Sequence, residues 1–214
     1  MLIIGILLAL AVDRWNQGRL DGIETAQIVK RLKSDTARNL AMFEESLPFM
    51  QRNLANIMAL FRALETSTMI NEDPADIEAA LAYMDVIPNY PLVFAGYDEL
   101  VATGRLRQLE DPVLIDLLGS QRAEYEAALA VVGYWRDGIQ GVLDLLDQYV
   151  DFYYTSEEMS ERAMGVKFDF AELTSDRVLK NRVFDAVDIH GDWLGVQNRI
   201  YEITKQIDAR LGAN

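Results

Sequence analysis

Apolar residues recur at alternating spacings of three and four along most of this chain, a spacing typical of an α-helix that turns one face toward a neighbouring helix. The first such stretch continues from an apolar N-terminal segment to about Glu65. Pro48 lies inside it, so we expect one long helix with a bend at the proline. Its apolar positions are Ile28, Leu32, Leu40, Phe43, Leu47, Met50, Leu54, Ile57, Phe61 and Leu64.

A second stretch keeps the same period from Asp111-Pro112 to Tyr153. The aspartate can cap a helix, and proline is favoured at the first helical position. Trp135 falls on its apolar seam. We expect three glycines in this helix to permit close packing beside the tryptophan or a local bend. These are Gly133, Gly138 and Gly141.

A third stretch begins at Ser175 or Asp176 and ends near Gly212, a residue favoured just past a helix C-terminus. The segment before it, 155–174, is irregular. Strand-like alternation of useful length is not found, so the sequence predicts no β-sheet.

The region between the first two stretches predicts short elements. A helix is expected from Pro74 to Met84, and a turn at Pro88-Asn-Tyr-Pro91. The segment AGYDELVATGRLRQLEDP predicts another short helix that ends at Thr103-Gly104 and leads into the second long helix. The elements together predict an all-α protein: an N-terminal membrane helix (1–16) and an elongated antiparallel bundle (17–214) of three long helices plus short ones.

The first segment is apolar from Met1 to Val12, and we predict that it is a membrane anchor. As a helix it covers about 18 Å, whereas the hydrocarbon layer is about 30 Å thick, so we expect a truncated start or a span completed by a partner protein. A cleaved signal peptide is an alternative, because Ala9-Leu10-Ala11 fits a cleavage pattern, although a basic segment does not precede the apolar run. A buried soluble helix is the third alternative.

Two features favour the membrane. Gly5 and Ala9 form a small-xxx-small pair, which allows two helices to approach closely in lipid. Arg14 and Trp15 follow the apolar run and suit a membrane interface. The side of the membrane stays open, because the basic residues after the run favour a cytoplasmic body but acidic residues are interleaved with them.

The composition excludes several classes of function. The formal net charge of −14 disfavours nucleic acid as a partner and disfavours adhesion of the whole surface to anionic lipid. The chain has no cysteine, so disulfides and thiol catalysis are excluded. Its size and its half-apolar content fit a folded domain with a real core.

Motifs for chemistry are not apparent, and we predict no catalytic residue, cofactor site or metal site. The only histidine, His190, lies among Asp185, Asp188 and Asp192. On a helix His190 points away from the face shared by residues 188 and 192, so a solvated acidic face is favoured over a metal site. Nucleophile-elbow and phosphate-loop motifs are not found. We therefore expect a protein that is not an enzyme.

The aromatic residues Phe152, Tyr153 and Tyr154 cannot all face one helical seam. Packing against Phe168 and Phe170 is the favoured interpretation. An exposed patch that binds a partner is the alternative.

Several short motifs resemble a family of bacterial single-pass membrane proteins known only as a domain of unknown function. The family is similar in its G-I-L-[IL]-A-L helix ending in W-N and in a later Y-x-E-L-x-x-[ST]-G-x-[LI] turn. Its members often carry a basic segment and further apolar residues before the first motif, so the resemblance implies a truncated or unusual N-terminus here. It also implies an anchored helical body outside the cytoplasm and no catalytic residue. The matching residues are Gly5 to Leu10, Trp15-Asn16, Tyr97, Glu99-Leu100, Thr103-Gly104 and Leu106.

The leading expectation is a non-catalytic, membrane-anchored accessory or stabilising subunit of a larger membrane complex, with a respiratory or photosynthetic complex as one candidate. Residues 1–16 would contact lipid and other transmembrane subunits in the bacterial inner membrane, with the bundle in the periplasm. The alternative is an extracytoplasmic sensory or ligand-binding bundle of the four-helix type. Homo-oligomers formed through the apolar seams are a third possibility.

Overall fold

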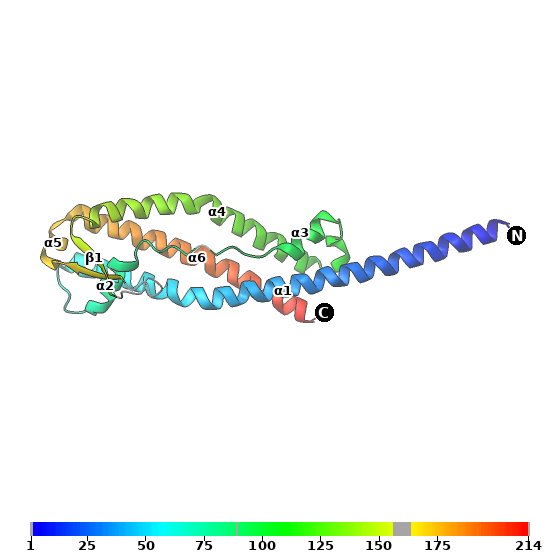
Figure 1. The fold of residues 1–214 in the computed structure, drawn as a ribbon, viewed down its shortest axis with the longest axis horizontal. Helices are drawn as coiled ribbons and strands as arrows, with labels where there is room; N and C mark the ends of the chain where they lie inside the picture. Colours follow the sequence, from blue (N-terminus) through cyan, green and yellow to red (C-terminus); the bar gives the residue numbers. More distant parts are fainter. Residues whose placement is uncertain (1, 89, 156–163, 214) are drawn as a thin grey trace. The chain divides into compact units, whose positions relative to one another are not determined.

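The computed structural model describes residues 2–88, 90–155 and 164–213, with the side chains of residues 2–5, 7 and 9 outside the description. Three long helices dominate these residues (Figure 1). The elements in chain order are α1 (Leu2–Thr66), α2 (Pro74–Tyr83), α3 (Ala95–Ala102), the 3₁₀ helix η1 (Leu106–Leu109), α4 (Pro112–Leu146), β1 (Val150–Tyr154), β2 (Met164–Phe168), α5 (Phe170–Ser175) and α6 (Arg177–Ala213).

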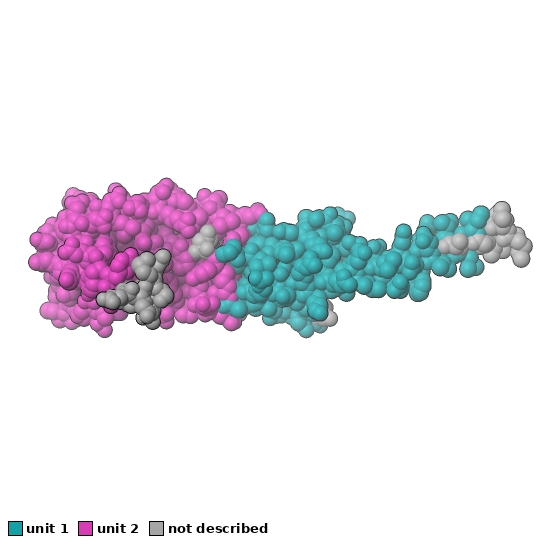
Figure 2. Space-filling view, in the orientation of Figure 1, with its two compact units in different colours: residues 1–41, 91–123, 202–214 teal, residues 42–90, 124–201 magenta. Residues whose placement is uncertain are grey.

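The chain divides into two compact units (Figure 2). Unit 1 comprises residues 1–41, 91–123 and 202–214, and unit 2 comprises residues 42–90 and 124–201. The long helices α1, α4 and α6 each contribute residues to both units.

The predicted helices are confirmed at most of their boundaries. Helix α1 ends at Thr66, one residue beyond the expected end, and Pro48 lies within it. Helix α4 begins at Pro112, and the backbone N–H of Leu114 donates to Asp111 Oδ1 at 3.0 Å, as expected for an N-cap. At the start of α6 the N–H of Val178 donates to Asp176 Oδ1 at 2.6 Å.

The prediction that the second helix continues to Tyr153 and that β-structure is lacking was wrong. Helix α4 ends at Leu146, and β1 pairs with β2 in an antiparallel sheet whose register places Val150 opposite Phe168. A short apolar run fits a helix or a strand equally well by spacing alone. The pairing with residues 164–168 decides between them, and that contact is distant in sequence.

The membrane-spanning helix expected at the N-terminus is not found. None of the helices, over the residues that the structure describes, has an apolar stretch long enough to cross a membrane. The segment itself is helical, as part of α1, but charged Asp13 and Arg14 follow its apolar run.

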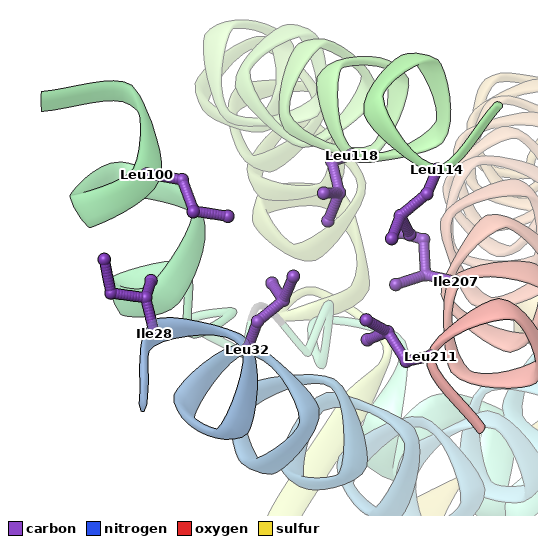
Figure 3. Packing of buried hydrophobic residues seen from close by; sticks show 7 residues of the cluster. All are labelled: Ile28, Leu32, Leu100, Leu114, Leu118, Ile207 and Leu211. Carbon is purple, nitrogen blue, oxygen red and sulfur yellow. The ribbon is translucent and has the colours of Figure 1, made fainter. Parts of the chain in front are cut away.

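Unit 1 is organised around a core to which four helices contribute. Figure 3 shows the seven buried side chains of this core pointing toward one another. Tyr97, Leu106 and Ile203 are partly buried against it. The seven residues are Ile28 and Leu32 from α1, Leu100 from α3, Leu114 and Leu118 from α4, and Ile207 and Leu211 from α6.

Helix α3 contacts α1 at Gly96, where the two backbones lie very close. An ideal Cβ at Gly96 would lie 2.7 Å from the backbone nitrogen of Leu32 and 2.8 Å from its Cα atom. The N–H of Gly96 donates to Asp35 Oδ2 at 2.7 Å, and Asp35 is buried. A larger residue would force α3 away from α1, so glycine is required here for packing.

We expect Gly96→Ala to lower the free energy of unfolding by roughly 1–3 kcal/mol, because the added methyl group overlaps backbone atoms that cannot move independently. Gly119→Ala is the matched control in unit 1, since a Cβ there meets nothing within 4 Å. Alanine should stabilise that helical position by up to about 1 kcal/mol. Urea unfolding followed by circular dichroism measures the free energy of unfolding of both variants. If both substitutions changed it in the same direction, the close-packing argument would be contradicted.

In unit 2, one side of α6 packs against the segment that follows α2. Trp193 is buried, and its indole Nε1–H donates to the carbonyl of Pro88 at 2.9 Å. Its ring also packs edge-on against Trp135 of α4, with centroids 5.4 Å apart. On α1, the side chain of Asn53 donates to the carbonyl of Tyr83 at 3.0 Å. These bonds hold the last residue of α2 and the non-helical segment after it against the long helices, because their carbonyl groups find side-chain donors.

Candidate functional site

The first part of α1 is helical, apolar and exposed. Ile6, Leu8, Leu10 and Val12 are between 50% and 62% exposed, and Trp15 is 70% exposed. Every residue from 10 to 24 is exposed. A run of large apolar side chains in water is costly, so this segment is a candidate contact for lipid or another protein.

The residues predicted for this segment are only in part described. Arg14 and Trp15 are exposed, and their interfacial role stays a prediction. Gly5 and Ala9 lie in α1, but their side chains are outside the described residues, so their packing role stays a prediction.

The segment 95–111, which we call the clamp, holds α1 where its exposed part ends. Arg105 lies 3.1 Å from an Asp21 carboxylate oxygen and 2.5 Å from one of Glu24. Glu99 pairs with Arg31, which follows Glu24 along α1. These ion pairs are exposed and each contributes little, but together with the buried core they fix the register of α3 on α1.

The turn motif behind the family resemblance is structural in this protein. Leu100 is fully buried in the unit 1 core, and Tyr97 and Leu106 pack against that core. Gly104 adopts a φ of +69°, which favours glycine, and it ends the turn after α3. The motif therefore shapes the clamp.

The clamp ends at Asp111, which joins α4 to α6. Its carboxylate accepts from the Leu114 N–H and pairs with Arg210 of α6 at 2.8 Å. These interactions, the backbone hydrogen bond first, hold the pKa of Asp111 below its usual value. The cap of α4 and the tie to α6 thus share one side chain.

The predicted aromatic patch lies on β1. Phe152 and Tyr153 are partly exposed and Tyr154 is 70% exposed. Tyr153 is the most constrained: its ring lies across Gly165 on β2, where a Cβ would come within 2.4 Å of it, and Lys167 Nζ is 5.3 Å from its centroid.

The strand register shows which residues lie opposite this patch, and the favoured packing against Phe168 and Phe170 stays a prediction. The residues opposite the three aromatic residues are Val166, Gly165 and Met164, whereas Phe168 lies opposite Val150. The side chains of Phe152 and Tyr154 leave the strand on the face opposite to Tyr153.

His190 is a buried structural residue. Its Nε2 lies 2.8 Å from the carbonyl oxygen of Met84. A carbonyl only accepts, so Nε2 carries a proton and donates. Burial lowers the pKa of His190, against smaller opposing effects of this hydrogen bond and of Asp85. Among the described residues, His, Asp and Glu side chains do not gather into a group of three that could bind a metal ion.

The carboxylates near His190 in sequence instead line a groove between α4 and α6 in unit 2, which we call the α4–α6 groove. It contains two hollows of about 300 and 340 Å³ that share Trp135 and Asp192. Val131 and Val196 line the first hollow, and Ile189 lines the second. Apolar side chains therefore form part of the groove lining, and we call this part the apolar floor.

Gly138 permits the close approach of the two helices along this groove. A Cβ there would lie 2.7 Å from Ile189 Cδ1. The packing predicted for the three glycines of α4 is thus confirmed at Gly138, whereas Gly133 and Gly141 have nothing within 4 Å of a Cβ position.

The rim of the α4–α6 groove is acidic. Arg199 pairs with Glu124 at 3.6 Å, and Arg182 pairs with Asp185 at 3.2 Å. Three further rim carboxylates are exposed, and in the described part of the chain none of them takes part in an ion pair. They are Asp137, Asp188 and Asp192. The helical spacing of the α6 carboxylates predicts a solvated face. That spacing is visible in the sequence, whereas the surface of α4 that faces them is not.

Comparisons with known proteins find no matching family model, curated protein or solved structure. The function proposed below therefore rests on the geometry and on the sequence motifs.

We expect His190 to make the protein less stable at mildly acidic pH. Its pKa is lower in the folded than in the unfolded state, so the unfolded chain binds the proton first. Stability is then present above the ordinary pKa of about 6.5 and is lost as the pH falls toward the folded value, with a slope of at most about 1.4 kcal/mol per pH unit. Urea unfolding between pH 5 and pH 8 measures it.

His190→Gln is the control, because glutamine can donate to the Met84 carbonyl without titrating. The difference between the two proteins in unfolding free energy should change with pH in this window. Parallel pH profiles would contradict the argument.

Proposed function

We propose that this protein is a non-catalytic helical module, attached to a membrane by the apolar end of α1, that serves as an accessory or stabilising subunit of a larger membrane complex. The observation that carries the proposal is the exposure of Ile6, Leu8, Leu10 and Val12 on a helical segment. Each side chain of this kind gains about 1.5–3 kcal/mol on full burial, so the segment has a strong tendency to enter lipid or an apolar interface.

The continuity of α1 supports an anchoring role. One helix extends from the exposed end to Thr66, and the clamp ties it to the body at Asp21, Glu24 and Arg31. Burial of Ile28 and Leu32 in the unit 1 core continues this attachment. If the apolar end of α1 binds a membrane, the packed residues of unit 1 are therefore held at that membrane.

Replacing Leu8 and Val12 together by Asp should release the protein from membranes. Both side chains are more than half exposed, so the fold should not change. The ratio of membrane-bound to soluble protein after a high-salt wash should fall about tenfold or more, since the substitutions remove apolar burial. Sedimentation of membranes and immunoblotting measure this ratio.

The matched control is Ile70→Asp with Val178→Asp, two apolar residues that are 88% and 55% exposed outside this segment. It should leave the membrane-bound fraction unchanged. Equal retention of the two double variants would overturn the anchoring proposal. Static light scattering after extraction in a mild detergent tests the subunit role, and a protein of monomer mass alone would overturn that part.

The proposed location of the body is the periplasm of a bacterium, which rests on the family resemblance. The chain contains no cysteine, so Glu78→Cys introduces a single exposed thiol on α2. We expect a membrane-impermeant maleimide to label it in cells whose outer membrane has been opened. Labelling only after lysis of the inner membrane would instead place the body in the cytoplasm. A cytoplasmic protein labelled only after lysis is the control for integrity.

A ligand-binding bundle is the second candidate function. The two hollows of the α4–α6 groove favour it, since their volumes suit a small molecule. The exposure of the rim carboxylates argues against a ligand-binding function, because a ligand pocket usually buries most of the bound molecule.

A further inference from the structure

We infer that the α4–α6 groove of unit 2 is a docking site for a basic, amphipathic helix of a partner protein. The inference deepens the proposed function, on which it rests, by naming the surface that a partner subunit would occupy and the chemistry of that subunit's segment.

The shape of the groove fits a helix. Helices α4 and α6 lie side by side in unit 2 (Figure 1), and both hollows lie along their seam. The lining of α6 extends from Arg182 to Arg199, about 26 Å of helix at 1.5 Å per residue. Two packed helices leave a groove that accepts a third, and among the described residues only these two helices line the hollows.

The other side of α6 is already covered by this chain. His190 and Trp193 bond to the carbonyl groups of Met84 and Pro88, so the segment after α2 lies against that face. The α4–α6 seam has no comparable cover in the described part of the chain. Exposed Tyr134 adds an aromatic side chain beside it.

The charges of the groove favour a cationic partner. The two arginines of the rim are paired with Glu124 and Asp185, which leaves Asp137, Asp188 and Asp192 as excess negative charge around an apolar floor. A helix with apolar residues on one face and Lys or Arg beside them would match both features. An acidic helix would be repelled, and a second copy of this acidic chain is disfavoured.

The test uses the full-length protein in a nonionic detergent and a fluorescent 18-residue helical peptide, with leucines on one face and lysines beside them. The version with glutamate in place of lysine is the peptide control. Fluorescence anisotropy should show binding of the lysine peptide that weakens as salt is raised, and much weaker binding of the glutamate peptide. Failure of the lysine peptide to bind, or equal binding of both, would overturn the inference.

The variant Asp137→Asn, Asp188→Asn, Asp192→Asn removes the unpaired charges without changing the size of the side chains. We expect its affinity for the lysine peptide to fall about tenfold, the effect of losing three favourable charge contacts at an interface. The control Glu44→Gln, Glu65→Gln, Glu78→Gln removes three exposed carboxylates elsewhere on unit 2 and changes the net charge equally. Equal losses in both variants would show non-specific attraction and overturn the inference.

A separate variant tests the contribution of the apolar floor to peptide binding. Val131→Lys places a positive charge in the first hollow, and because Val131 is 40% exposed the fold should persist, which thermal unfolding verifies. It should weaken binding of the lysine peptide at least as much as the triple Asn variant. Unchanged binding would place the peptide outside the groove and overturn the assignment.

Other occupants give different results. Displacement of the peptide by millimolar spermidine with unchanged affinity for the Val131→Lys variant would indicate a small organic cation instead. Self-association that the triple Asn variant abolishes would indicate a second copy. The groove variants should retain membrane attachment, and the Leu8→Asp, Val12→Asp variant should retain peptide binding, so failure of this inference and failure of the anchoring proposal are distinguishable.

Discussion

The contact of α3 with α1 at Gly96 is the constraint on which unit 1 depends. The α3 backbone can approach α1 this closely only because no side chain intervenes, and the buried Asp35 carboxylate receives the Gly96 N–H. This approach brings Leu100 into the core beside Ile28 and Leu32. The stripe of α1 that the core buries therefore begins where the clamp holds the helix, and the apolar residues before it have no cover among the described residues.

Two surfaces of the described structure lack a partner, and they differ in character. The first part of α1 carries apolar side chains that are at least half exposed, which suits lipid or the interior of another protein. The α4–α6 groove combines an apolar floor with excess carboxylates, which suits a charged partner in water. The proposals assign one role to each surface.

Residues that invite a chemical interpretation in sequence have structural roles. His190 is surrounded by aspartates in the chain, yet its ring faces the opposite side of α6 and donates to a backbone carbonyl. Glu99 and Gly104, which carry the family resemblance, belong to an ion pair and a turn. A helix separates neighbours in sequence onto different faces, so proximity along the chain is poor evidence for a shared site.

The sequence by itself determined the three long helices and their starts, but not the end of α4. These signals are local: apolar spacings of three and four, the start at Asp111-Pro112 and the stop at Thr103-Gly104. Each of them acts through hydrogen bonds and packing between residues close in sequence. It also identified the apolar end of α1 and the absence of familiar catalytic motifs. Tertiary structure alone decided the rest. Three of these features join residues distant in sequence. They are the β1–β2 pairing, the close approach of Gly138 to Ile189, and the position of Asp137 and Asp188 at one groove. No local periodicity encodes such contacts, because they depend on which helix faces which.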